Sequence, residues 1–122
     1  MVVDQLSREL DDDGVDRIFQ ALADATRRDI VSRTMQDEYS VTELAERYAM
    51  SFAAVQKHVA VLERAGLVSK RARGRERVVT ADPEAIRRAS RLLDAYELLW
   101  RQRAQSMESI LAEDAEDRRT DR

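Results

Sequence analysis

The segment between residues 47 and 77 holds the side chains of this chain that are best suited to binding a charged ligand. Eight of its residues are Lys or Arg and only two are acids, Glu63 and Glu76, which gives a local charge of about +6. The whole chain of 122 residues has a net charge of −3. A local reversal of sign of this kind lets an acidic protein bind a polyanion.

A short helix is predicted within this basic segment, directly after residue 51. Ser51 is of the type that caps a helix N-terminus, and Val55, Val59 and Leu62 recur at i, i+4 and i+7 as a core stripe. Gly66 follows the stripe, where a glycine commonly ends a helix. The pattern predicts an amphipathic helix whose other face is open to a ligand.

The outer face of that helix carries hydrogen-bonding groups beside small residues. Gln56 can bond N6 and N7 of adenine, and Lys57 can reach a guanine edge or a phosphate. The small Ala53 and Ala60 would let the helix approach base edges, which favours DNA contact over a merely solvated face. Phe52 has two equal alternatives, contact with a thymine methyl group or packing on the preceding helix.

Two β-rich runs around Arg73-Gly74 predict a basic hairpin after the helix. Arginine suits such a hairpin because its planar fork can bind a phosphate or enter a narrow minor groove. The alternative is a solvated hairpin tip. The DNA-contacting residues expected on the helix and hairpin together are Ser51, Phe52, Ala53, Gln56, Lys57, His58, Lys70, Arg71, Arg73, Arg75 and Arg77.

Histidine and cysteine are too scarce for a metal or catalytic centre. The chain has no cysteine and one histidine, His58, so no pair of soft ligands is available. His58 is expected either to contact a phosphate or to pack beside the core. Arg27 and Arg28 could touch phosphates or pair with the acidic tails. From the scarcity of cysteine and histidine we predict no enzyme activity, no metal site and no cofactor.

The elements that must position these side chains can be read along the chain. An apolar stripe from Val15 predicts a first helix, and Asp24 can cap a second. Residues 39–41 could form a short strand, and Thr42 could cap a third helix over residues 43–48 that buries Leu44 and Ala45. Asp82 and Pro83 begin a last helix of about 30 residues, which would span about 45 Å.

The apolar stripe of the last helix is too long to be buried within one small domain, so a dimer is expected. Trp100 and Tyr96 could line a ligand pocket, but an interface is the favoured interpretation. The interface residues expected are Ile18, Leu22, Leu93, Tyr96, Trp100, Met107 and Leu111.

Three segments are expected along the chain. Residues 1–14 form an acidic, disordered tail, residues 15–112 form the folded domain with its dimerisation helix, and residues 113–122 form a charged, disordered tail. No apolar run approaches a membrane span, and the first residues lack the pattern of a signal peptide. A cytoplasmic protein is therefore expected.

The order of the elements and four sequence segments resemble the ArsR family of bacterial repressors. The predicted fold class is accordingly mainly α-helical, a winged helix-turn-helix with a small β-hairpin wing and a long C-terminal dimerisation helix. The segments that carry the resemblance are residues 19–31, 41–45 and 54–68, and the wing around Gly74-Arg75.

The resemblance implies a homodimer that binds an inverted-repeat operator in double-stranded DNA and represses transcription until an inducer releases it. Many family members sense metals through cysteines at the start of the third helix, where this chain has Val41, Thr42 and Glu43, or through histidines on the last helix, where it has none. Metal sensing is not carried over. The alternative function is a winged-helix protein-interaction module without specific DNA binding.

Overall fold

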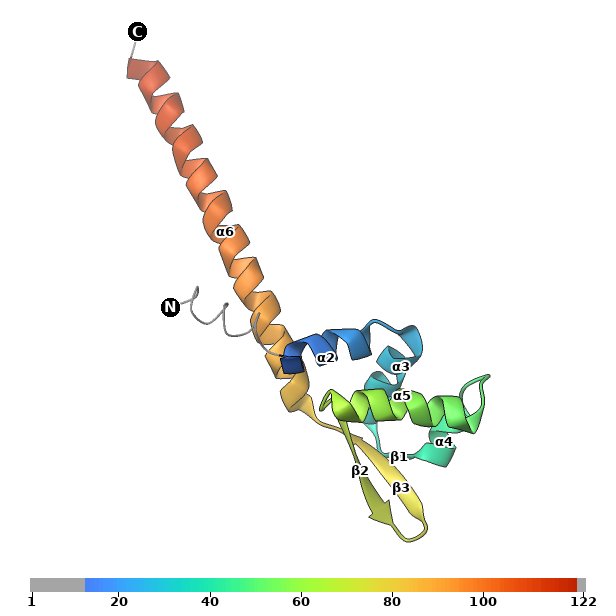
Figure 1. Ribbon diagram of the computed structural model, residues 1–122. Coiled ribbons are helices and arrows are strands. Elements are labelled where there is room, and N and C mark those ends of the chain that lie inside the picture. The colour runs from blue at the N-terminus through green and yellow to red at the C-terminus, as the bar shows by residue number, and fades with distance from the viewer. Residues whose placement is uncertain (1–12, 121–122) are drawn as a thin grey trace.

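The computed structural model describes residues 13–120 as a helical domain with a small sheet at one end and a long helix that leaves it at the other (Figure 1). This confirms the predicted fold class of a mainly α-helical winged helix-turn-helix. In chain order the elements are α2 (Asp13–Leu22), α3 (Ala25–Gln36), β1 (Tyr39–Ser40), α4 (Val41–Ala45), α5 (Phe52–Arg64), β2 (Val68–Arg73), β3 (Glu76–Ala81) and α6 (Pro83–Thr120).

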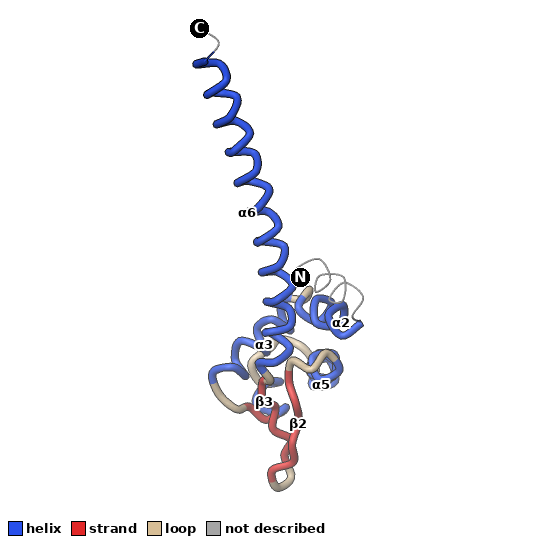
Figure 2. The backbone as a smooth tube through the Cα atoms, turned by 90° about the vertical axis from the view of Figure 1, so that its left-hand side faces the viewer, coloured by secondary structure: helices blue, strands red, loops and turns tan. Residues whose placement is uncertain are grey.

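The wing is the hairpin of β2 and β3, extended by the two residues of β1. The antiparallel sheet has the order β1-β3-β2, with Ser40 opposite Val78 and Arg71 opposite the same residue on the other side. Gly74 lies at the tip with φ of +64°, a left-handed conformation that glycine adopts without strain. Figure 2 shows the hairpin projecting from the helices at the end opposite the free part of α6.

The core lies where α2, α3, α4, α5 and the sheet meet. The predicted stripe of α5 is confirmed, because Val55, Val59 and Leu62 have no exposed surface. Burying side chains of this size contributes roughly 1.5–3 kcal/mol each to folding. The stripe fixes which face of α5 is turned outward. The other hydrophobic side chains with no exposed surface are Ile18, Ala21, Ile30, Leu44, Leu67, Val78 and Val79.

Helix ends follow the local sequence closely. Asp24 accepts a hydrogen bond from the backbone N–H of Arg27 at 3.0 Å, and Asp82 accepts one from that of Glu84 at 3.0 Å. These two predicted caps are confirmed. Gly66, with φ of +77°, follows the C-cap of α5 as predicted.

The prediction for the third helix was wrong in its cap and its bounds. Ser40 is the N-cap of α4: its Oγ accepts from the backbone N–H of Glu43 at 3.0 Å, and the Glu43 carboxylate accepts from that of Ser40 at 3.2 Å. This reciprocal capping box satisfies two free helix donors, whereas Thr42 could satisfy fewer. The helix therefore begins at Val41 and ends at Ala45, with Leu44 fully buried and Ala45 half-buried.

The folded segment is longer at both ends than the sequence suggested. α2 starts at Asp13, and α6 continues as a helix through residues 113–120, which were expected to form a disordered tail. The last turn contains Arg118 and Arg119, whose charges complement the negative end of the helix dipole. Residues 1–12 and 121–122 lie outside the described residues, as does most of the predicted N-terminal tail. No helix among residues 13–120 has an apolar stretch long enough to cross a membrane.

Candidate nucleic-acid interface

The outer face of α5 is open to solvent along its N-terminal half. Phe52, Ala53, Gln56 and Lys57 are all exposed, as predicted from the helical period. Ser51 caps the helix, its Oγ accepting from the backbone N–H of Ala54 at 3.1 Å. Gln56 and Lys57 form no hydrogen bond or ion pair within the described part of the chain, so both are free to bind a ligand.

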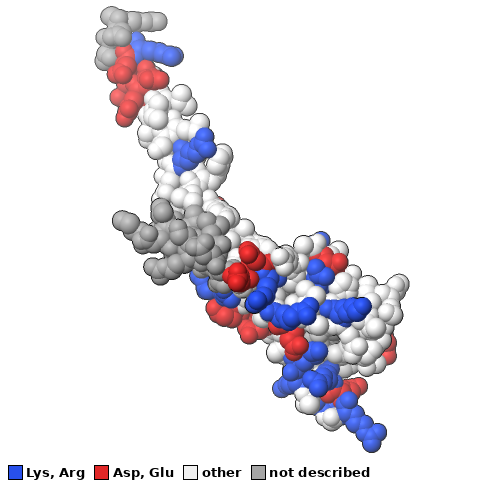
Figure 3. All heavy atoms as spheres, viewed as in Figure 1, with Lys and Arg blue, Asp and Glu red and all other residues white. Residues whose placement is uncertain are grey.

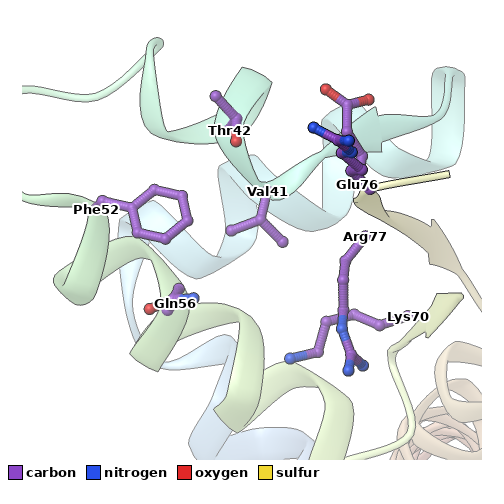
Figure 4. A pocket seen from close by; sticks show the side chains of 8 residues that line it. Val41, Thr42, Phe52, Gln56, Lys70, Glu76 and Arg77 are labelled. Carbon is purple, nitrogen blue, oxygen red and sulfur yellow. The ribbon is translucent and has the colours of Figure 1, made fainter. Parts of the chain in front are cut away.

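A groove runs between this half of α5, the short helix α4 and the wing (Figure 4). Its volume is about 250 Å³. In the figure Phe52 and Gln56 project from α5, and the charged ends of Lys70 and Arg77 lie in the space between the wing and α5. The residues that line the groove are Val41, Thr42, Phe52, Gln56, Lys70, Arg75, Glu76 and Arg77.

Phe52 lies against the preceding helix, and its contact with a thymine methyl group stays a prediction. Its side chain shares the groove with Val41 and Thr42 of the preceding helix, and it is still 46% exposed. Val41 and Thr42 were not expected at this site. They come from a different helix, and the signal that could have found them is the capping box, which places residues 41 and 42 in the first turn of α4.

The cationic residues of the wing divide between its two faces. Cross-strand partners share a face, so Lys70 lies with Val79 and Arg77 with Ala72, whereas Arg71 lies opposite Val78 and Arg73 opposite Glu76. Lys70 and Arg77 therefore face the groove. Arg71 and Arg73 lie on the other face.

Ion pairs follow the same division. Glu38 holds both arginines of the far face, with Arg71 Nη2 at 2.6 Å from its Oε1 and Arg73 Nη1 at 3.4 Å from its Oε2. Lys70 Nζ lies 3.7 Å from Glu63 Oε1, a loose pair. Arg75 and Arg77 have no ion pair among residues 13–120, so their charges are the least compensated on the wing.

His58 belongs to the interior side of α5. Its Nδ1 lies 3.3 Å from Nη1 of Arg27 and 3.9 Å from Oδ1 of Asp24, and the side chain is half-buried. His58 therefore lies beside polar groups and not in the core cluster, and its contact with a phosphate stays a prediction. The hydrogen bond from the Arg27 backbone, with the charges of His58 and Arg27 nearby, lowers the pKa of Asp24.

Arg27 and Arg28 have a role that the sequence did not suggest. Arg27 donates from Nε to the carbonyl of Ala21 at 2.7 Å and from Nη2 to that of Gln20 at 3.0 Å. Arg28 donates from Nη1 to the carbonyl of Leu22 at 2.8 Å. Both arginines therefore satisfy carbonyls at the C-terminal end of α2, where a helix leaves acceptors free.

Lys and Arg side chains gather on the face of the molecule shown in Figure 3, over the helical domain and down to the tip of the wing. The acidic side chains on this face are more scattered, and several lie near the far end of α6. The basic side chains on this face form several patches with acidic side chains between them, and they continue to the tip of the wing. A surface with an exposed polar helix face, a groove and a basic hairpin can bind a nucleic acid through bases and phosphates.

Comparison with known proteins gives a consistent result. A family model for a helix-turn-helix domain matches residues 22–71. The HTH-type transcriptional regulator Rv2034 of Mycobacterium tuberculosis is 42% identical over 81 residues, which cover 66% of this chain and 76% of that protein. The crystal structure of an ArsR family transcriptional regulator, RHA00566, is 32% identical with a TM-score of 0.69, covering 72% of this chain and 91% of the other.

The chain belongs to the ArsR family of transcriptional regulators. A third comparison, with an ArsR-like transcriptional regulator from Rhodococcus sp. RHA1, has 29% identity and a TM-score of 0.71 over 80% of this chain and 92% of that one. The protein is thus a DNA-binding transcriptional regulator with a winged helix, which confirms the family suggested by residues 19–31, 41–45 and 54–68.

Two side-chain clusters hold the helix-turn-helix of this ArsR-family regulator in shape. Tyr48 donates to Oδ2 of Asp29 at 2.5 Å, and Arg33 Nε donates to the same oxygen at 2.7 Å. The hydrogen bonds from Tyr48 and Arg33 lower the pKa of Asp29, while burial and the bond to Asp29 raise the pKa of Tyr48 to about 12. Arg47 stacks over the ring of Tyr39 with its guanidinium carbon 5.0 Å from the centroid. Together they tie the turn before α5 to α3 and β1.

The regulator's expected interface residues fall into two groups. Ile18 has no exposed surface and packs in the chain's own core, so it offers nothing to a partner, and Leu22 is only partly buried against the same core. Ile18 therefore lies in the core of the single chain, whereas it was predicted to lie at the dimer interface. The members that lie on α6 are exposed, namely Leu93 (52%), Tyr96 (43%), Trp100 (66%), Met107 (53%) and Leu111 (66%).

Proposed function

We propose that this ArsR-family regulator represses transcription as a homodimer that reads an inverted-repeat operator with Gln56 and grips the DNA backbone with the wing. The observation that carries the proposal is the groove shared by Gln56 and the wing. In it an uncommitted amide on the outer face of α5 lies beside Arg77, a cation without an acid partner among the described residues. The amide is suited to a base edge and the guanidinium to a phosphate.

The two contacts should have different consequences for sequence preference. Base contacts specify the sequence, whereas phosphate contacts position the protein without reading it. Phe52 adds an apolar surface beside Gln56, suited to a thymine methyl group. Ser51, Ala53, Lys57 and Lys70 are proposed as further contacts at the edge of the groove. We place Arg71 and Arg73 at the periphery of the contact, since both already pair with Glu38, whose carboxylate offsets one of their two charges.

We expect Gln56→Ala to relax base preference at one position of each half-site, at a cost of roughly 1–3 kcal/mol for the preferred sequence. Selection of bound sequences from a random pool, followed by fluorescence anisotropy on the selected operator, measures both effects. Gln36→Ala is the matched control, because Gln36 is an exposed amide on α3 that bonds only Ser32. An unchanged sequence preference in the Gln56 variant would remove that residue from base reading.

We expect Arg75→Ala to weaken binding to all sequences alike and to reduce the slope of log K against log salt by about 0.9 per half-site, as for one lost phosphate contact. Arg71→Ala removes the same charge from the same hairpin, but Arg71 is held by Glu38 on the other face. Its effect on affinity and slope should be clearly smaller. Equal losses in the two variants would show that the wing acts only through its total charge.

The homodimer is proposed from the free part of α6. Beyond Leu92 no residue of this helix is buried, although large apolar side chains continue to Leu111. Figure 1 shows this part of the helix extending away from the rest of the domain. Exposed apolar surface of this extent is unusual on a monomer. Pairing with a symmetry mate would bury it and would place two copies of α5 about one DNA turn, roughly 34 Å, apart.

We propose that operator binding is independent of transition metals. Among residues 13–120 no group of three or more Asp, Glu or His side chains is placed to hold an ion. We expect micromolar zinc, copper or arsenite, and metal chelators, to leave the anisotropy of bound operator unchanged. Release of the DNA by one of these metals at micromolar concentration would overturn this part of the proposal.

We further propose that the protein acts in the cytoplasm, where its DNA target is, and that it has no catalytic activity. The alternative of a winged-helix module that binds only other proteins would not need uncompensated arginines on the groove side of its wing. Heparin retention together with a salt-dependent DNA shift is expected here, and neither is expected of a purely protein-binding module.

A further inference from the structure

A second hollow lies between α2 and the C-terminal half of α5, away from the groove that contains Gln56. Its volume is about 300 Å³, at the lower end of the range for small-molecule sites. Arg17 and Gln20 line it from α2, and Val61 and Arg64 line it from α5. Each pair is three residues apart, so each helix presents its two side chains on one face.

The two arginines of this hollow form no hydrogen bond, ion pair or ring contact with any of residues 13–120. Within residues 13–82 every other arginine outside the wing tip and groove is engaged: Arg27 and Arg28 with carbonyls, Arg33 with Asp29, and Arg47 with the Tyr39 ring. In that range the arginines without a hydrogen bond, ion pair or ring contact are Arg17, Arg64, Arg75 and Arg77. Arg75 and Arg77 belong to the proposed DNA contact. Arg17 and Arg64 do not, so they could bind another anion.

Among residues 13–120, no acid forms an ion pair with Arg17 or Arg64. Glu63, next to Arg64 on α5, faces Lys70 of the wing at 3.7 Å. Asp13 and Asp16 lie on α2 with Arg17, but neither forms an ion pair with it. Both arginines line the same hollow, where like charges without a counter-charge repel each other, and an anion bound between them would relieve that repulsion.

The walls of the hollow are fixed by packing and hydrogen bonds. Ile18 on α2 and Leu62 on α5 have no exposed surface, so neither helix can rotate without disturbing the core. The carbonyl of Gln20 accepts from Arg27 Nη2 at 3.0 Å, which anchors the end of α2. A site on two such helices is preorganised, and preorganisation lowers the entropic cost of binding.

We propose that Arg17, Gln20 and Arg64 bind a small anion that bears a carboxylate or phosphate group, and that its binding weakens the hold on DNA. Each guanidinium can donate a pair of hydrogen bonds to such an oxyanion, and the Gln20 amide can donate another. Val61 supplies an apolar wall for the rest of the ligand. The link to DNA rests on the proposed function.

The position of the hollow explains why a bound anion would weaken DNA binding. Arg64 is eight residues from Gln56 on the same helix, about 12 Å along its axis. An anion there neutralises the charge of Arg64 on α5 and that of Arg17 on the adjacent α2, and so lowers the positive potential that attracts a polyanion to α5. α2 also packs against α6, so the ligand would lie against a helix that contacts both α5 and the helix proposed for the dimer. Couplings between two ligand sites typically change affinity by about 5–150-fold.

Isothermal titration calorimetry of the full chain with inorganic phosphate and with citrate, at constant ionic strength in a chloride buffer, tests the site itself. We expect binding to the wild type and at least a tenfold weaker affinity in Arg17→Gln and in Arg64→Gln. Arg103→Gln is the matched control, an exposed arginine on α6 without an ion pair in the described chain. Thermal unfolding of each variant checks that the fold is kept. Equal heats for all four proteins, or no binding to the wild type, would overturn the proposal.

Operator affinity measured without added anion separates this site from a DNA contact. Arg17→Gln and Arg64→Gln each remove one of the two charges, so each is expected to weaken operator binding less than citrate does in the wild type, and their DNA binding should no longer respond to citrate. If they instead weaken DNA binding as much as Arg75→Ala, the hollow receives a backbone phosphate, and the small-anion proposal is wrong. Should the wild type fail to bind any operator, the proposed function fails, while calorimetry still decides the anion site.

Discussion

Replacing Ile18 with alanine is expected to lower the free energy of unfolding by about 2–5 kcal/mol, the usual cost of truncating a buried isoleucine. Ile18 has no exposed surface and belongs to the core cluster with Ala21, Ile30 and Leu62. Removing three carbons there leaves a cavity that the surrounding helices cannot fill without moving α2. Urea unfolding followed by circular dichroism measures the loss, with the slope m showing whether the unfolded state has changed.

Phe19 provides the matched control on the neighbouring position of α2. Its side chain is larger than that of Ile18, but it is 37% exposed and lies outside the core cluster. Phe19→Ala should therefore cost clearly less than Ile18→Ala, although it removes more atoms. If Ile18→Ala left the unfolding curve in place and altered only the oligomeric state, its side chain would belong to an interface after all.

Ile18 also shows what helical periodicity can and cannot predict. The stripe of Val15, Ile18, Phe19 and Leu22 correctly predicted a helix, but Phe19 is 37% exposed, so the buried face is narrower than the stripe. Periodicity gives no information about what covers that face, and Ile18 was expected at a dimer interface for that reason. In the structure α2 packs against α3, α5 and α6, and the last two of these helices are distant in sequence.

Helix caps depend on a few adjacent residues and could be predicted from the sequence. The one cap that was predicted wrongly, that of α4, also has its cause in adjacent residues. The caps at Asp24, Ser51 and Asp82, and the glycine stop at Gly66, each depend on a few adjacent residues. Ser40 and Glu43 also lie close in sequence, but two side chains of capping type, Ser40 and Thr42, compete there. Only the reciprocal bond between Ser40 and Glu43 decides between them.

Contacts between distant residues could not be read from the sequence. Glu38 is 33 residues from Arg71, and Tyr48 is 19 residues from Asp29. The hairpin was predicted, but which of its arginines would be compensated depended on the register and on where β1 joins the sheet. The division of the wing into a face paired with Glu38 and a face lining the groove therefore came from the structure.

The expected consequence of Trp100→Ala is a shift from dimer to monomer, by at least about 2 kcal/mol of association free energy, or roughly 30-fold in the dissociation constant. Trp100 is 66% exposed in the single chain and lies near the middle of the apolar stripe of α6. A tryptophan can bury more than 150 Å², so its loss removes one of the largest apolar contacts available to the helix pair. Sedimentation should give a wild-type mass near twice 14.0 kDa.

Operator binding should fall in the same variant, although every proposed DNA contact is intact, because affinity for an inverted repeat depends on both half-sites. Gln102→Ala, an exposed polar position two residues along the same helix, should change neither mass nor affinity. Raising the protein concentration should restore the Trp100 variant's binding, since mass action reforms the dimer. A wild type that stays monomeric at micromolar concentration and still binds its operator tightly would remove α6 from the mechanism, and the exposed stripe would then need a different partner.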